Sequence, residues 1–165
     1  MRPLELAQLA DELGLDYVGV QDHPYQRRFH DTWTLMTAIA MRTQRISIFP
    51  DVACLPLRPP AMLASGPQPA HPMGIWLGVY KPRGLGLVGR LADGWVPSLG
   101  YVAPDNLDAG NQRIDEAAQE AGRDPAAITR VLNVMDRPSP ELLANLALEH
   151  GMDTFLAAQG EEPET

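Results

Sequence analysis

The chain has 165 residues, 45% of them hydrophobic and 21% charged, which is typical of a globular protein long enough to form a core. Its formal net charge of −8 argues against nucleic acid as a partner, because binding a phosphate backbone requires clustered lysine and arginine. The single cysteine excludes an internal disulfide framework. The four histidines and this cysteine show no spacing typical of metal ligands, so no metal site is predicted.

The composition also bears on the location of the protein. The N-terminal segment MRPLELAQLADELG carries charges throughout and lacks the apolar core of a signal peptide. No apolar run approaches the ~20 residues that cross a membrane. These features predict a cytoplasmic protein that does not bind membranes.

Apolar periodicity and turn residues predict that helices and strands alternate along the chain. The expected helices cover residues 3–13, 33–43, 61–64, 82–92, 104–121 and 139–150. The expected strands cover residues 16–21, 45–54, 75–80, 95–96, 128–135 and 152–158. Asp31 or Thr32 can cap the second helix and Ser139 the last one. The last helix is expected to bury four side chains: Leu142, Leu143, Leu146 and Ala147.

Residues 65–73, SGPQPAHPM, contain three prolines and no periodicity, which indicates a connector. Residues 159–165 form an acidic tail that is expected to be mobile. We therefore expect one α/β domain over residues 1–158, with a connector at 65–73. Strands that each accompany a helix are parallel, and about six of them can form a doubly wound open sheet or an incomplete barrel.

Parallel α/β proteins bind ligands at the carboxyl ends of their strands. Asp22 and His23 directly follow the first strand, and an imidazole there can donate or accept a proton near neutral pH. Asp22 either orients the imidazole or caps the loop, and the pair is equally compatible with a purely structural turn. Cys54, after the second strand, is expected to be a buried thiol rather than a nucleophile. Arg58 either pairs with a phosphate or carboxylate or lies on the surface.

A strand, a helix and a second strand follow one another in residues 74–100, which suggests an anion or cofactor site near residues 78–81. Lys81 and Arg83 flank Pro82 at the start of this helix, where two cations and free N–H groups suit a phosphate. A purely structural strand–helix–strand unit is the alternative. The pattern G-x-G-x-x-G at residues 84–89 lies inside the helix rather than in a strand-to-helix turn, so a nucleotide fingerprint is rejected.

Five segments together resemble the luciferase-like monooxygenase family, the bacterial luciferase-type flavin and deazaflavin oxidoreductases. They are LAQLADELGLDYVGVQDHP, TLMTAIAMRTQRISIFPDVACLPLRPPAMLA, IWLGVYKPRGLGLVGRLADGWVPSLGY, NQRIDEAAQEAGRDPAAI and LALEHGMDTF. They occur in the family's order and cover most of the chain. RLADGW, followed by a helix that contains AGRDP, is a fairly specific combination.

The resemblance implies a TIM-type (β/α)8 barrel with a flavin or the deazaflavin F420 at the carboxyl ends of the strands. Here the barrel is expected to be incomplete, with about six parallel strands and outer helices. The family's first strand precedes Pro3, and another strand with several helices lies between Ala64 and Ile75. Without these segments, we expect part of the cofactor wall and most of the substrate pocket to be missing.

The resemblance also assigns the site residues. Asp22 and His23 match the strand-end Asp-His of the deazaflavin-using branch, in which the histidine lies by the reacting ring. Asp51 and Val52 match a non-proline cis peptide that supports this ring. The turn that holds the ribityl and phosphate part of the cofactor corresponds to four residues: Gly78, Val79, Tyr80 and Lys81.

The sequence thus predicts a shortened oxidoreductase or monooxygenase that uses F420 or FMN to transfer a hydride to a small organic substrate. His23 and Asp22 are the expected catalytic residues, and the cofactor carries the chemistry. Two alternatives stay open at this point. One is a non-catalytic remnant that binds a flavin or nothing and pairs through its open strand edges with another chain that supplies the missing strands, and the other is a remnant that folds poorly. A homodimer is a possible partner arrangement.

Overall fold

The computed structural model describes residues 2–27, 29–59, 61, 63, 73–135 and 137–157. The chain divides into two compact units, Met1–Gln68 and Pro69–Thr165, and each is described by itself. The division falls within the connector predicted at residues 65–73. That connector up to residue 72, two of the four residues of the helix predicted at 61–64, and the acidic tail at 159–165 lie outside the described residues. One domain over residues 1–158 stays a prediction.

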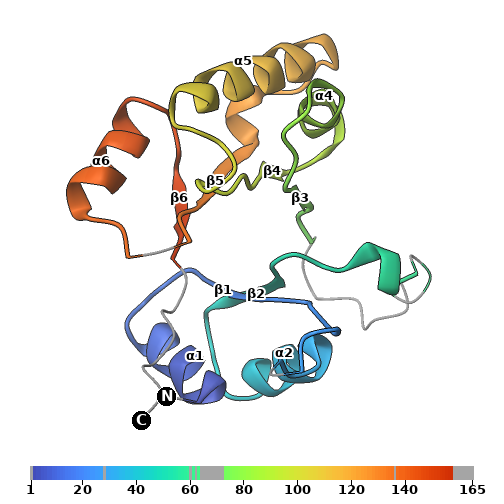
Figure 1. The fold of residues 1–165 in the computed structure, drawn as a ribbon, viewed down its shortest axis with the longest axis vertical. Helices are drawn as coiled ribbons and strands as arrows, with labels where there is room; N and C mark the ends of the chain where they lie inside the picture. Colours follow the sequence, from blue (N-terminus) through green and yellow to red (C-terminus); the bar gives the residue numbers. More distant parts are fainter. Residues whose placement is uncertain are drawn as a thin grey trace. The chain divides into compact units, whose positions relative to one another are not determined.

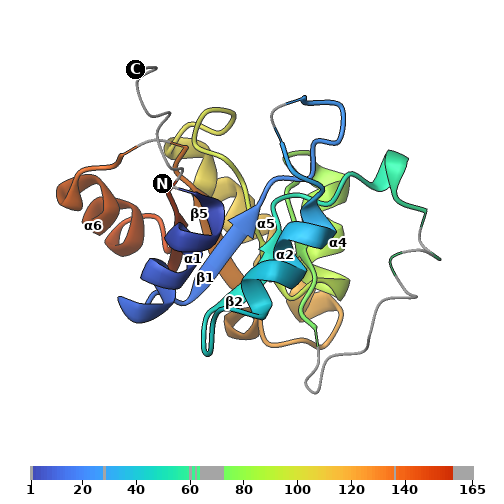
Figure 2. The same cartoon turned by 90° about the horizontal axis from the view of Figure 1, so that it is seen from below.

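The first unit is a two-stranded parallel sheet with two helices on one face. Its elements are α1 (Pro3–Glu12), β1 (Tyr17–Val20), α2 (Thr32–Ala40), β2 (Ser47–Pro50) and the short 3-10 helix η1 (Leu55–Leu57). Tyr17 pairs with Ser47 and Val20 with Pro50, so the two strands end together. Helices α1 and α2 lie along the same side of the strands (Figures 1 and 2), and their core contains Ala7, Val20 and Ile39.

Polar contacts fix the ends of both helices in this unit. Asp31 caps α2, because its carboxylate accepts a hydrogen bond from Thr34 N at 3.0 Å. Gly14 follows α1 with a φ of +82°, which a glycine adopts without steric cost. The carboxylate of Asp11 accepts the backbone N–H groups of Gln44, Arg45 and Ile46, which lowers its pKa and joins α1 to the chain before β2.

The second unit is a four-stranded parallel sheet with helices outside it. Its elements are β3 (Trp76–Leu77), α4 (Pro82–Leu91), β4 (Gly94–Trp95), α5 (Asp105–Glu120), η2 (Pro125–Ala127), β5 (Thr129–Asn133), α6 (Pro140–Leu148) and β6 (Thr154–Leu156). The strand order is β3-β4-β5-β6, which follows the chain. A doubly wound sheet reverses its order at a switch point, so the sequential order favours the barrel alternative.

Close packing of α4 and α5 over the sheet forms the core of the second unit. The two helices lie side by side (Figure 1). Trp95 is 1% exposed, and its indole donates a hydrogen bond to Val79 O at 2.8 Å. A Cβ at Gly110 would lie 2.4 Å from the Trp95 ring, and one at Gly89 would lie 2.4 Å from Ile114 O. Two glycines therefore allow α5 to approach β4 and α4.

The structure corrects the expected buried face of α6. Leu146 is fully buried, as predicted, but Leu143 is only half-buried, Leu142 is 36% exposed and Ala147 is exposed. A helix on the outside of a sheet contacts it along a narrow stripe, so positions beside that stripe stay in water. Ser139 caps α6 by accepting a hydrogen bond from Leu142 N, as expected.

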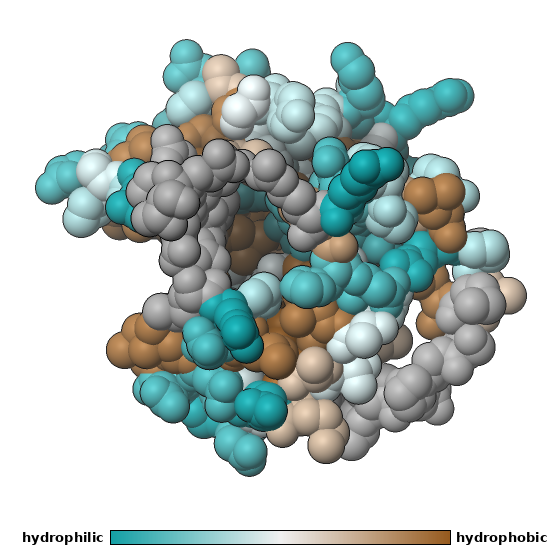
Figure 3. All heavy atoms as spheres, turned by 60° about the horizontal axis from the view of Figure 1, so that its bottom comes forward, coloured by the Kyte–Doolittle hydropathy of each residue, from teal (hydrophilic) through white to brown (hydrophobic). Residues whose placement is uncertain are grey.

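Figure 3 shows charged and polar residues over much of one face, with hydrophobic patches between them. None of the helices in the described ranges is long and apolar enough to span a membrane.

Candidate functional site

The carboxyl ends of β1 and β2 bring four predicted site residues to one edge of the first unit. Val20 pairs with Pro50, and Asp51 N donates to Val20 O at 2.8 Å, so the two chains leave the sheet side by side. Asp22 and His23 follow β1, while Asp51 and Val52 follow β2. The peptide bond between Asp51 and Val52 is cis, as the resemblance implied.

Asp22 is held by a two-pronged contact with Arg58. Its carboxylate is 1% exposed and accepts Arg58 Nε at 3.0 Å, an Arg58 Nη at 2.8 Å and Cys54 N at 2.9 Å. The Arg58 hydrogen bonds lower the pKa of Asp22 to about 2, and the pKa of Arg58 is raised in return. Of the two roles expected for Asp22, this geometry supports holding the loop rather than orienting the imidazole.

The same arginine joins three segments of the first unit. Arg58 also lies 3.2 Å from the Asp31 carboxylate at the start of α2 and 5.7 Å from the centre of the Trp33 ring. The carboxylates that Arg58 contacts belong to the chain itself, so the structure shows Arg58 as a residue that holds segments together. Sequence reasoning missed Thr32, whose hydroxyl donates to Gln21 O at 2.8 Å from a side chain that is 1% exposed.

His23 lies among aromatic side chains of its own loop. The Tyr25 hydroxyl is 3.1 Å from His23 Nδ1, and the two rings stack with centroids 5.4 Å apart. Phe29 also stacks on the imidazole, at 5.9 Å and an interplanar angle of 19°. Aromatic residues two and six positions after the histidine were the signal that could have revealed the cluster.

Asp51 differs from the other carboxylates of the site because burial dominates its environment. Desolvation raises its pKa, and the charge of His23 opposes that shift. A Cβ at Gly19 would lie 3.1 Å from Asp51 Cβ and 3.3 Å from the Phe49 ring. Glycine at this position of β1 therefore leaves room for Asp51 over the strand.

The other four predicted site residues lie in the second unit, at the end of β3. Gly78 and Val79 follow this strand, and Val79 O accepts the Trp95 indole. The ring centroids of Tyr80 and Tyr101 lie 6.1 Å apart. Tyr101 follows β4 and was not predicted as a site residue. Lys81 precedes α4, and no side chain caps this helix.

Lys81 and Arg83 are both exposed at the N-terminus of α4. The backbone N–H groups there point out of the helix with the positive end of its dipole. Two cations and free donors are the chemistry that an anionic group requires. The first unit thus contains a histidine and two carboxylates at the ends of its strands. The second contains a strand-to-helix turn with two cationic side chains.

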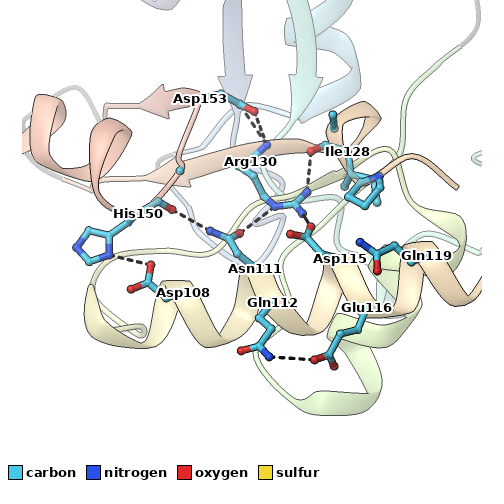
Figure 4. Close-up of a pocket in the computed structure, with 13 residues that line it drawn as sticks. Asp108, Asn111, Gln112, Asp115, Glu116, Gln119, Ile128, Arg130, His150 and Asp153 are labelled. Atoms are coloured by element: carbon cyan, nitrogen blue, oxygen red, sulfur yellow. Dashed lines mark hydrogen bonds and ion pairs between the residues drawn. The ribbon is translucent and has the colours of Figure 1, made fainter.

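A separate polar cluster surrounds Arg130, close to the start of β5 (Figure 4). Its guanidinium, in a side chain that is 9% exposed, donates to Asn111, Asp115 and Ile128 O, while the Asp153 carboxylate accepts Arg130 N. Burial lowers the pKa of Arg130, and the carboxylates oppose that shift. Because each described polar group of this arginine is satisfied, the cluster ties α5 to β5 and β6. In the described part of the chain, no group of three acidic, histidine or cysteine side chains could hold a metal ion.

An α/β protein with parallel strands and polar residues at their carboxyl ends is the class that this geometry defines. The model of the luciferase-like monooxygenase family matches residues 2–66 and 63–150. The chain belongs to this family, and the resemblance is confirmed.

Curated relatives match a shorter stretch. The phthiodiolone/phenolphthiodiolone dimycocerosates ketoreductase of Mycobacterium tuberculosis strain H37Rv is 40% identical over 55 residues, which is 33% of this chain and 14% of that protein. The enzyme of the same name from Mycobacterium kansasii is 41% identical over 54 residues, again 33% of this chain and 14% of the relative. The match thus spans about one seventh of the length of these relatives.

Solved structures show the same fold over most of the chain. An F420-dependent secondary alcohol dehydrogenase in complex with an F420-acetone adduct has a TM-score of 0.62 at 16% identity, and covers 88% of this chain and 70% of its own. The oxygenating constituent of 3,6-diketocamphane monooxygenase from Pseudomonas putida, in complex with FMN, has a TM-score of 0.63 at 16% identity. The match covers 89% of this chain and 65% of that one. The coenzyme F420 dependent tetrahydromethanopterin reductase from Methanopyrus kandleri has a TM-score of 0.67 at 15% identity. The match covers 93% of this chain and 73% of that one. The fold class is that of an incomplete TIM-type barrel.

Proposed function

We propose that the chain binds F420 or FMN at the carboxyl ends of its strands and transfers a hydride to a small organic substrate. The observation that carries the proposal is the position of His23, which follows β1 beside the end of β2 and is ordered by neighbouring side chains. Structures of the same fold that carry F420 and FMN in their descriptions support it.

The donors at the start of α4 suit the anionic part of such a cofactor. Lys81, Arg83 and the first N–H groups of α4 would hold its anionic part, and the turn from Gly78 to Tyr80 would contact the chain that follows. Asp51 and Val52 would lie against its ring, as the resemblance implies. When bound, F420 or FMN supplies a ring that accepts or donates a hydride.

The residues of the first unit would then have distinct duties. His23 would hold a proton at an imidazole nitrogen next to the reacting atoms. Asp22 would act on it only indirectly, since its carboxylate is committed to Arg58 and Cys54 N and keeps the loop in place. We therefore propose Asp22 as a positioning residue.

Cofactor binding is tested by a thermal melt with and without excess F420 or FMN. A ligand that binds only the folded state adds roughly 2.7 kcal/mol of stability at a hundred times its dissociation constant. The proposal expects one cofactor to raise the midpoint. A cooperative melt that neither cofactor shifts would contradict it and favour a non-catalytic remnant.

The role of His23 is tested by His23→Ala, which is expected to abolish turnover while the cofactor still shifts the melt. His30→Ala is the matched control, because His30 is exposed on the same loop. Full turnover in His23→Ala would remove this histidine from the mechanism.

Two further predictions concern assembly and location. Among the described strands, β2 pairs with β1 alone, and β3 with β4 alone. Strand edges of this kind favour pairing with a second copy of the chain, so we propose a homodimer, to be tested by sedimentation. A cytoplasmic location stays a prediction.

A further inference from the structure

We propose that Tyr25 is a positioning residue that sets the tautomer of His23 and places the imidazole proton on Nε2. The Tyr25 hydroxyl lies 3.1 Å from His23 Nδ1, and the two side chains belong to the same loop after β1. The consequence for catalysis rests on the proposed function, whereas the tautomer itself does not.

The direction of this hydrogen bond follows from the chemistry of its partners. A neutral imidazole has one N–H donor and one bare acceptor nitrogen. A phenol is a better donor than acceptor, so the favoured arrangement is O–H of Tyr25 donating to Nδ1 of His23. Nδ1 is then unprotonated, and the ring proton must reside on Nε2.

Asp22 does not compete for this contact. The carboxylate of Asp22, next in sequence, already accepts three hydrogen bonds from Arg58 and Cys54 N. The stacked rings of Tyr25 and Phe29 restrict the rotation of the imidazole. Tyr25 therefore sets both the orientation of the ring and the nitrogen that carries the proton.

This choice decides what His23 offers to a bound molecule. With Nδ1 occupied by Tyr25, Nε2–H is the group left to act, and it is a hydrogen-bond donor. The opposite tautomer would offer an acceptor. Tyr25 thus makes His23 a donor toward a carbonyl or similar oxygen of the substrate.

The tautomer is measured directly from the 15N chemical shifts of the histidine rings in the full chain, at about pH 8, where an ordinary histidine is neutral. His150 is an internal standard, since its Nδ1 lies 3.1 Å from the Asp108 carboxylate, which only accepts. We expect a protonated Nε2 in His23 and a protonated Nδ1 in His150.

Tyr25→Phe removes only the hydroxyl and is expected to lower the ratio of the Nε2–H to the Nδ1–H tautomer of His23 roughly fivefold, as the loss of one hydrogen bond implies. Tyr101→Phe makes the same change on a side chain that is 80% exposed in the second unit, and should leave His23 unchanged. Phe29→Leu removes a stacking ring and should keep the tautomer. Tyr25 is 64% exposed, so its replacement should not alter the melting temperature.

A protonated Nδ1 in His23 of the unaltered chain would overturn the proposal. So would a tautomer ratio that does not change in Tyr25→Phe, or one that changes equally in Phe29→Leu. The measurement needs no cofactor. Failure of F420 and FMN to bind would therefore refute the proposed function and leave this result standing.

Discussion

Replacing Arg58 by methionine removes the positive charge that pairs with Asp22 and keeps much of the side-chain volume. The Asp22 carboxylate would then stay buried, at 1% exposure, and would keep the Cys54 N–H but lose its charged partner. An unpaired buried charge is destabilising because it has lost water without gaining a partner. Arg58→Met is therefore expected to lower the free energy of unfolding at neutral pH.

The magnitude follows from the pKa of Asp22, which is lowered from 3.8 to about 2 by hydrogen bonds from Arg58, the largest cause, and from Cys54 N and Thr32. A difference of nearly two units corresponds to about 2 kcal/mol at 1.36 kcal/mol per unit. The folded state lowers this pKa, so the stabilisation is complete above about pH 4 and disappears as the pH falls through about 2. The wild-type chain should lose this stabilisation on acidification, and Arg58→Met should lack it at every pH.

Urea unfolding followed by far-UV circular dichroism, at neutral pH and near pH 2.5, measures this difference. A double-mutant cycle with Asp22→Asn and Arg58→Met isolates the pair, and we expect a coupling of about 2 kcal/mol at neutral pH that shrinks in acid. Arg113→Met is the matched control, because its exposed pair with Glu116 is worth ~0.5 kcal/mol or less. A coupling near zero at neutral pH, or one that does not depend on pH, would refute the reasoning.

Three further substitutions test the second unit by thermal melts. Gly110→Ala puts a Cβ 2.4 Å from the Trp95 ring and should lower the free energy of unfolding by about 1–3 kcal/mol. Gly100→Ala is the control and should leave stability unchanged, because no atom lies within 4 Å of the new Cβ. Equal melting temperatures for the two variants would contradict the close packing. Arg130→Met leaves buried polar partners unsatisfied and should lower the free energy of unfolding by about 3 kcal/mol or more. A decrease below about 1 kcal/mol would contradict a stabilising role for the Arg130 cluster. Ser139→Ala removes the cap of α6 and should cost about 1 kcal/mol, which Ser139→Asp should restore.

The order and type of the elements could be predicted because they depend on local properties. The stripe of Leu85, Val88, Leu91 and Ala92 with Pro82 at its start predicted α4, which the structure places at Pro82–Leu91. Three of these side chains are buried, but Leu91 is exposed. Expected strands were longer than the observed ones. The run at residues 75–80 contributes only Trp76 and Leu77 to β3, since a strand lasts only as long as its neighbour pairs with it.

The site could be predicted only in part. Asp22 and His23 were found because their place after a strand is a local feature. Arg58 lies 36 residues beyond Asp22, and the choice between a ligand-binding and a loop-holding arginine depends on a contact across the fold. Tyr25 was missed because hydrogen bonding to an imidazole depends on how the loop folds back, which no periodicity records.

The sequence by itself determined the alternation of helices and parallel strands, the family and the edge at which polar residues gather, because periodicity, caps and motifs are written in neighbouring residues. The tertiary structure decided which charges neutralise one another, which aromatic rings order His23 and how closely α5 approaches Trp95. Those properties depend on burial and on distances between residues far apart in the chain, and burial determines whether Asp22 is a free acid or the anion that holds the loop.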